Sequence, residues 1–538
     1  MKHLKQTKII KCTLLGIVGI VCLYFIYNFV VKLIPHMAIE LAASYNWDTP
    51  VYWAMGRGIL NGLTPYVDMF EIKGPGIFYI TALSFLTSNG PWVGNLINFI
   101  CLLFIGFSPL GALLLTAKKI GIKSVNFITY PIAIIFGGII MMYSSFYAGQ
   151  IQTESFGAGF ACIYLMIIST IDVNKIKWNS ISIWLAAIFM MLSVGMKEPF
   201  ILLCFAGALI FATGLKHLFK VFILPLLYAI ALGALIMLVT GMLIPYFKNY
   251  LFYIFTNHVT RSGSIFEKLF AFEKFRLNLN SYSDQLLPIV IVSLVFSFLI
   301  VVFTIFQKNR SIWYKIFNII KFVPTILLPF LAVGLGGEYY GHHFIFAIPV
   351  YIALIIYMLI NLGTNNTTAQ SENKIIKSIA FAKHYILAII LLFSFSVVLD
   401  IKPFSMNSPL ATCMREAPVI NADANKVDAL LDKMNVDRYM YIGMNGPVFM
   451  GLTKHSPQGP IFLHDIRFFV SEYVKNNAMD EIKNSKILVV EDDLLKTGWK
   501  MYSPLREYME NNYTKNPPAI AKGLEMPSPM KYTVFFHK

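Results

Sequence analysis

Ionisable side chains gather in one short stretch near the start of the chain, between residues 44 and 80. The stretch is otherwise rich in aromatic residues, glycine and proline, and its charged members are Asp48, Arg57, Asp68, Glu71 and Lys73. Asp48 precedes a Thr-Pro pair and a helical pattern, so its carboxylate can cap a helix, bind a cation or accept a proton. Tyr52 lies one helical turn later and would share the face of Asp48.

Lys73 occurs in the sequence KGPG, directly before an apolar helical pattern. A lysine in this position can anchor the chain at the membrane surface, or it can hold a cation where a lipid phosphate would bind. Glycine on both sides of the proline would let another part of the backbone approach closely. We therefore treat Lys73 as a candidate substrate-binding residue, together with Tyr52, Arg57 and Asp68.

Glu154 is the single charged residue of the segment 143–159. It can cap a helix that begins at Ser155, or it can act with Asp48 as a second carboxylate. Two carboxylates from separate loops could bind a divalent cation such as Mg²⁺ or Mn²⁺, or could orient a sugar and its acceptor. Asp48 and Glu154 are thus the candidate catalytic residues and the candidate metal ligands.

Two later segments add candidate substrate-binding residues. The sequence GMKEPF contains Lys197 and Glu198, which can also form an ordinary surface pair. The segment 338–349, EYYGHHFIFAIP, contains Tyr340, His342 and His343. Such residues occur in the aromatic belt of membrane proteins, but histidines also donate hydrogen bonds to phosphate oxygens.

The elements that must position these side chains are long apolar runs. Of the 538 residues, 57% are apolar or aromatic and 13% are charged, half the charged share of a soluble domain. This composition excludes a soluble globule, a disordered acidic chain and a disulfide scaffold. We expect a mostly α-helical, polytopic membrane bundle of about eleven spans, near residues 12–34, 92–116, 124–143, 156–171, 180–196, 199–213, 221–244, 286–306, 322–336, 343–361 and 385–400.

The distribution of lysine and arginine predicts the orientation of this bundle. With the N-terminus inside, the inner segments hold 18 basic residues and only Asp172 and Glu372 as acids, as the positive-inside rule requires. The C-terminus then lies outside. Residues 75–88 are too short to span and are expected to form a re-entrant or interfacial helix in the first outer loop. The net charge of +16 therefore reflects topology and does not indicate binding of nucleic acid.

The composition changes abruptly after residue 400. Helical patterns at 423–434 and 503–512 alternate with strand patterns at 438–444, 486–492 and 532–537. We expect a membrane domain over residues 1–400 and a small exterior α/β domain over residues 401–538.

The quoted motifs together resemble a known family. The segment from Trp47 to Ile80, the acid in the second outer loop, GMKEPF and EYYGHHFIFAIP resemble, in order and spacing, bacterial GT-C class glycosyltransferases of the protein O-mannosyltransferase and lipid A aminoarabinose transferase group. The resemblance covers roughly residues 1–360. In one respect the sequence departs from the pattern, because Thr49 stands where a second acid is frequent, and this puts a family-wide metal site in doubt.

The resemblance implies a membrane enzyme that transfers a sugar from a polyprenyl-phosphate carrier to an acceptor of the cell envelope, on the outer face of the cell membrane. It implies that Asp48 is the general base and that Glu154 orients substrate or shares a divalent cation. Lys73, with His342 or His343, would stabilise the departing lipid phosphate. The expected partners are the lipid-linked donor, membrane lipids and an envelope acceptor.

Two other classes of protein remain open from the sequence. A transporter or flippase of lipid-linked saccharides would also have many spans, although it should show internal repeats and charges within the spans. A non-catalytic envelope assembly protein that presents the C-terminal domain would not need acids confined to the first two outer loops.

Overall fold

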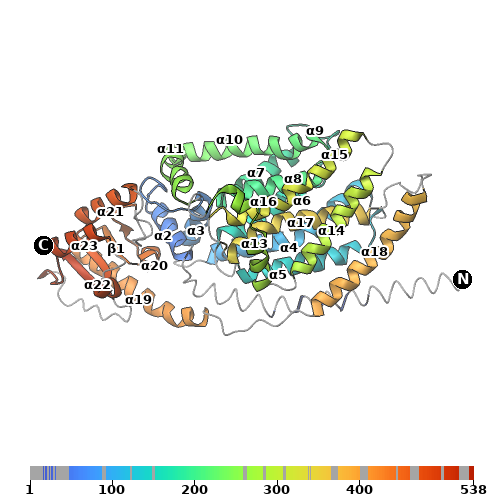
Figure 1. Ribbon diagram of the computed structural model, residues 1–538. Coiled ribbons are helices and arrows are strands. Elements are labelled where there is room, and N and C mark those ends of the chain that lie inside the picture. The colour runs from blue at the N-terminus through green and yellow to red at the C-terminus, as the bar shows by residue number, and fades with distance from the viewer. Residues whose placement is uncertain are drawn as a thin grey trace.

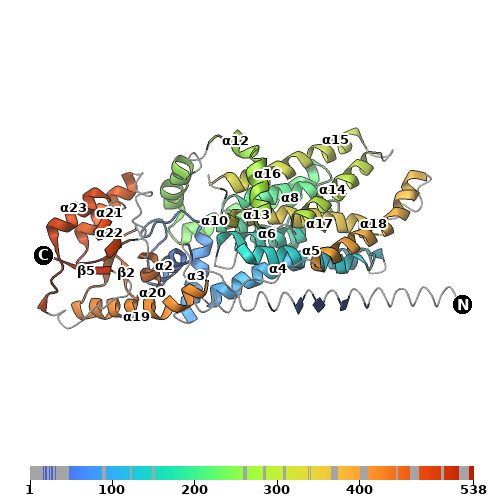
Figure 2. The same ribbon diagram turned by 60° about the horizontal axis from the view of Figure 1, so that its bottom comes forward.

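The structure is a computed structural model, and it places an elongated bundle of helices beside a small mixed domain at one end (Figure 1). The helices α2 (Thr49–Leu60) and α3 (Pro75–Thr87) lie between the two parts in both views (Figures 1 and 2). The structure describes scattered residues between 16 and 31 and residues 48–87, 92–121, 124–147, 152–258, 263–282, 286–306, 311–336, 339, 341–364, 374–399, 410–443, 446–460, 472–497, 502–519 and 532–538.

Apolar helices make up the bundle. Within the described residues, five helical stretches are long and apolar enough to cross a membrane: Val93–Ile120, Leu215–Val239, Leu286–Ile305, Ile312–Gly334 and Gly341–Gly363. Shorter apolar helices pack among them, and the chain is therefore a membrane protein. The number of spans stays a prediction, and the first predicted span, 12–34, lies almost wholly outside the described residues.

The bundle elements have the following bounds: α4 Trp92–Ile120, α5 Thr129–Tyr147, α6 Thr153–Ile168, α7 Ile181–Met196, α8 Phe200–Phe211, α9 Leu215–Leu218, η2 Phe219–Ile223, α10 Leu224–Val239, α11 Leu243–Pro245, η3 Tyr246–Leu251, η4 Ile254–His258, α12 Ile265–Leu269, α13 Phe272–Tyr282, α14 Leu286–Ile305, α15 Ile312–Ile320, α16 Phe322–Gly334, η6 Gly341–Ala347, α17 Ile348–Gly363 and α18 Lys374–Leu399. Helix α15 occupies most of the gap that the sequence prediction leaves between the spans 286–306 and 322–336.

Small residues let the central helices approach closely. A side chain at Gly137 on α5 would overlap the carbonyl group of Gly106 on α4. A Cβ at Gly159 on α6 would lie 2.6 Å from Cys101 on α4. In a membrane, where lipid is as apolar as leucine, such close backbone contacts are a main source of helix association.

The C-terminal region contains a five-stranded sheet in the order β2-β1-β3-β5-β4. Strands β1 (Arg438–Ile442), β2 (Ser456–Pro457) and β3 (Ile487–Glu491) are parallel, whereas β5 (Tyr532–His537) is antiparallel to β3 and to β4 (Tyr513–Thr514). The helices of this region are α19 Leu410–Met434, α20 Gly446–Leu452, α21 Glu472–Asn484, α22 Asp492–Thr497 and α23 Ser503–Asn512. The α/β character predicted for the region is confirmed. The domain boundary at residue 400 stays a prediction.

Candidate active site

Asp48 occupies the N-cap position of α2 but does not cap it. Its carboxylate makes no hydrogen bond with the first turn of the helix, so the capping interpretation was wrong. Instead, Oδ2 lies 3.6 Å from Nζ of Lys73. The Asp48 side chain is 32% exposed and that of Lys73 is 15% exposed, which leaves one face of the carboxylate open to an incoming group.

Lys73 reaches this position because the glycines of KGPG let the chain dock on the end of α7. A side chain at Gly74 would overlap the carbonyl oxygen of Gly195 and would lie 2.7 Å from that of Met196. The hydroxyl of Tyr66 donates a hydrogen bond of 2.5 Å to the carbonyl oxygen of Lys73. The close approach predicted for this motif is confirmed, and it brings Lys73 beside the residue that follows α7, Lys197.

Gly74→Ala is expected to lower transfer activity at least tenfold, because an added methyl group must push Lys73 away from the end of α7. Overpacking of this kind costs about 1–3 kcal/mol, and a displacement of about 1 Å at an active site can cost on the order of 10² in rate. Gly233→Ala is the matched control, since its Cβ would meet only Met191 at 3.8 Å. Activity and the unfolding midpoint of both purified variants are the measurements, and equal activities would contradict the docking role.

Glu154 forms the second ion pair of the site. Helix α6 begins at Thr153, so Glu154 lies within its first turn and not at its cap. Its Oε1 lies 2.5 Å from Nζ of Lys197, and its Oε2 accepts a hydrogen bond of 2.9 Å from the Thr153 hydroxyl. The carboxylate is fully buried, and a buried charge requires such partners.

The two histidines lie beside Glu154. The nitrogen and oxygen ligand atoms of Glu154, His342 and His343 all lie within 4.8 Å of one another, and the two imidazole centroids are 4.5 Å apart. Nζ of Lys197 also lies 5.1 Å from the ring centroid of Phe346, one turn further along η6. Glu154, Lys197 and the histidines therefore form one polar cluster against an aromatic wall.

Long-range electrostatics join the two ion pairs into one site. Burial alone would lower the pKa of Lys73, but the carboxylates of Asp48, Glu154 and Glu71 outweigh it and raise that pKa to about 12. Lys197 in turn interacts with both Glu154 and Asp48. Lys73 therefore keeps its charge at all physiological pH values, as a phosphate-binding group must.

Glu71 is a third acid of the site, which the sequence reasoning left without a role. The residue is 8% exposed, and burial raises the pKa of its carboxyl group from 4.5 to about 7, with Lys73 opposing the rise. Between these two values the folded state binds a proton that the unfolded state lacks, so the free energy of unfolding falls as the pH rises.

Glu71→Gln is therefore expected to stabilise the protein more at high pH than at low pH. A shift of this size corresponds to about 3 kcal/mol, so the gain from glutamine should grow by up to that amount between about pH 4.5 and pH 7 and then stay constant. Unfolding midpoints of both proteins in detergent, from about pH 5 to pH 8, measure it. A gain that does not change with pH would show that Glu71 is ionised throughout.

Glu198 does not pair with its neighbour Lys197. Its Oε1 accepts hydrogen bonds of 2.9 Å from the hydroxyls of Tyr246 and Tyr250, and the Tyr250 ring lies 4.9 Å from that of Tyr66. Glu198 thus contacts the segment after α10 directly, and through Tyr250 and Tyr66 this segment packs on the loop that carries Lys73. The sequence reasoning did not single out these tyrosines, although their i, i+4 spacing places both on one face of a helix.

The remaining predicted site residues have different surroundings. Tyr52 is fully buried and interacts with Asp48 and Glu154; burial raises its pKa well above the usual value, so its hydroxyl stays protonated.

Arg57 stacks on Phe85 at 4.2 Å and interacts with Asp428 of the C-terminal region. Asp68 accepts a 2.8 Å hydrogen bond from the backbone of Thr64. Tyr340 lies outside the described residues.

Comparison with known proteins finds likenesses among solved structures. No protein-family profile matches the chain, and no curated protein sequence matches it. Among solved structures, ArnT from Cupriavidus metallidurans in the apo state aligns with 90% of this chain and 95% of its own, at 15% identity and a TM-score of 0.48. ArnT is an aminoarabinose transferase. The likeness concerns overall arrangement only.

Proposed function

We propose that the protein transfers a sugar from a polyprenyl-phosphate carrier to an acceptor of the cell envelope, at the outer face of the membrane. One observation carries the proposal: the ion pairs Asp48–Lys73 and Glu154–Lys197 lie in one electrostatically coupled site. Each of the four residues comes from a motif of the glycosyltransferase resemblance. A base beside several cations is what displacement of a phosphate-linked sugar requires.

In the reaction, Asp48 is the general base. Its exposed carboxylate oxygen accepts the proton of the acceptor hydroxyl, and the acceptor oxygen forms a bond to the anomeric carbon of the sugar. The bond between that carbon and the phosphate oxygen breaks, and the electron pair leaves with polyprenyl phosphate. The Asp48 carboxylate is the more exposed member of its pair, so the acceptor approaches from the open side.

The cations act on the leaving group. Charge on the lipid phosphate grows as the glycosidic bond breaks, and Lys73, Lys197 and the donor nitrogens of His342 or His343 stabilise it. The Glu154 side chain is fully buried, and its two oxygens already contact Lys197 and Thr153. Its role is to hold Lys197 in place.

The divalent cation expected at Asp48 and Glu154 stays a prediction. Mg²⁺ and Mn²⁺ need free oxygen ligands, whereas each of these carboxylates has a lysine beside it. The donor set of Glu154, His342 and His343 suits a transition metal better. Because lysine already supplies positive charge at both carboxylates, we derive no step through a metal.

The test is transfer by the purified protein in detergent or vesicles. The protein is incubated with polyprenyl-phosphate-linked sugars and envelope extracts, and mass spectrometry follows the release of free polyprenyl phosphate and the labelled product. We expect both to appear in equal amounts, and a parallel series with a chelator tests the predicted cation. Movement of intact donor across the vesicle bilayer without its consumption would instead indicate a flippase.

A further inference from the structure

The C-terminal domain shares its hydrophobic cores with the loop that carries the active site. One buried cluster, here called the outer core, combines Tyr52 and Met55 of α2 and Ile77 and Phe78 of α3 with side chains of α19, β1, α20, β3 and β5, among them Val427, Leu430, Tyr441, Phe449, Val489 and Phe536. A second cluster, under the other face of the sheet, contains Phe70. The first outer loop therefore completes both cores.

Helix α2 is held between two partners. On one side, a Cβ at Gly56 would lie 2.7 Å from the backbone nitrogen of Ala82 on α3, and the Thr81 hydroxyl donates to the Tyr52 carbonyl at 2.7 Å. On the other side, a Cβ at Gly451 of α20 would lie 2.7 Å from Cβ of Trp53. The C-terminal domain thus forms one wall of the slot in which α2 lies.

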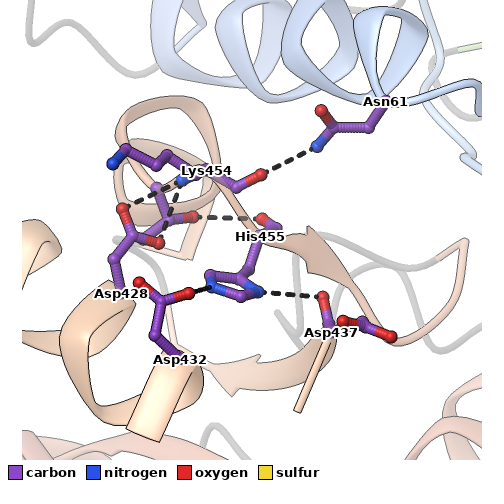
Figure 3. Close-up of polar contacts among 7 residues, drawn as sticks. Asn61, Asp428, Asp432, Asp437, Lys454 and His455 are labelled. Atoms are coloured by element: carbon purple, nitrogen blue, oxygen red, sulfur yellow. Dashed lines mark hydrogen bonds and ion pairs between the residues drawn. The ribbon is translucent and has the colours of Figure 1, made fainter. Parts of the chain in front are cut away.

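Polar contacts fix the far end of the same helix (Figure 3). The amide of Asn61, the residue after α2, donates hydrogen bonds of 3.0 Å to the Lys454 carbonyl and 2.9 Å to the Ser456 hydroxyl. Asp428 in turn accepts the Lys454 backbone N–H with both carboxylate oxygens at 3.0 Å. The loop that receives Asn61 is therefore itself held rigidly by α19.

The lysine side of the site is held as well. The backbone N–H of Phe70, three residues before Lys73, donates a hydrogen bond of 2.7 Å to the Pro460 carbonyl. The Phe70 ring packs on Tyr473 of α21 with a centroid separation of 5.3 Å. Asp48 and Lys73 are thus both carried on segments that the C-terminal domain holds.

We propose that the C-terminal domain is a positioning element of the active site, and that Asn61 and Gly451 are positioning residues that act through Asp48. A 12-residue helix moves as one body, so a contact that fixes its end at Asn61 also fixes Asp48 at its start. The catalytic part of this inference rests on the proposed function, whereas the mechanical part does not.

Hydrogen exchange tests the mechanical part without any substrate. Asn61→Ala removes both hydrogen bonds that the Asn61 side-chain amide donates. Gly451→Val adds a side chain that must push α20 away from Trp53. In both variants we expect the backbone amides of residues 49–60 to exchange at least tenfold faster than in the wild type, because their local opening is less costly. The control is Asn484→Ala, which removes an exposed amide that contacts only Asp480 on its own helix. Unchanged exchange in α2 of both variants would overturn the proposal.

Kinetics test the catalytic part. We expect Asn61→Ala to lower kcat about tenfold and to change the donor KM by less than about twofold, because chemistry and not donor binding depends on Asp48. In an Asp48→Asn background, Asn61→Ala should cause no further fall. Additive losses would overturn the proposal. If the wild type transfers no sugar, the proposed function fails, while the exchange experiment still decides whether the domain holds α2.

Discussion

Asp48→Asn is expected to reduce the rate of sugar transfer by a factor on the order of 10²–10⁴, the usual contribution of a positioned general base. Asparagine has the shape of aspartate but cannot accept the acceptor proton. The Asp48 carboxylate is 32% exposed and lies 3.6 Å from Lys73, so loss of this pair should cost less stability than loss of a fully buried pair. The expected result is thus a folded, donor-binding protein with a very low kcat.

The measurement is initial rate against acceptor concentration, with the unfolding midpoint of the same preparation. Asp172→Asn is a matched control, because Asp172 forms a similar exposed pair with Lys175, at 3.7 Å, outside the site. Wild-type transfer by Asp48→Asn, at normal expression, would remove Asp48 from the reaction.

Glu154→Gln should have the second large effect, and it should act on both stability and activity. The change leaves the ammonium group of Lys197 buried without its counter-charge, which typically costs 3–5 kcal/mol. Lys197→Met should be about as destabilising, because it leaves the fully buried Glu154 carboxylate unpaired. Transfer should fall in both variants. In Glu154→Gln the Lys197 ammonium group is no longer held in place, and in Lys197→Met it is absent, so neither variant can stabilise the phosphate from this position.

The double variant Glu154→Gln/Lys197→Met separates these two effects. It removes both buried charges together, so much of the lost stability should return. Transfer should stay low, because no ammonium group remains at that position. Unfolding midpoints and kcat of the two single variants and the double variant complete the cycle. A double variant as active as the wild type would mean that this pair is structural only.

The sequence predicted the helical bundle and the motifs of the site because both are local properties. Apolar runs and their lengths identify helices without any knowledge of packing, and the KGPG motif indicates a close backbone contact from its residue types alone. The helix 503–512 and the strand 532–537 were predicted at the bounds that the structure shows.

What the sequence could not predict are the partners of the charged residues. Asp48 was expected as a possible helix cap and Lys197 as a possible partner of Glu198, yet each pairs with a residue on another segment. Those pairings depend on the contact of Gly74 with the end of α7, which spacing along the chain does not encode. For the same reason, the interaction of Arg57 with Asp428, 371 positions later, could not be foreseen.

The shared outer core also sets the order in which the protein can mature. Tyr52 is synthesised hundreds of residues before Phe449, Tyr532 and Phe536, which belong to the same outer core. At about 5–20 residues per second, the ribosome needs on the order of half a minute or more to reach them. Until β5 is made, the outer core around α2 is incomplete, so we expect a polypeptide that stops short of β5 to carry every proposed catalytic residue without assembling the site.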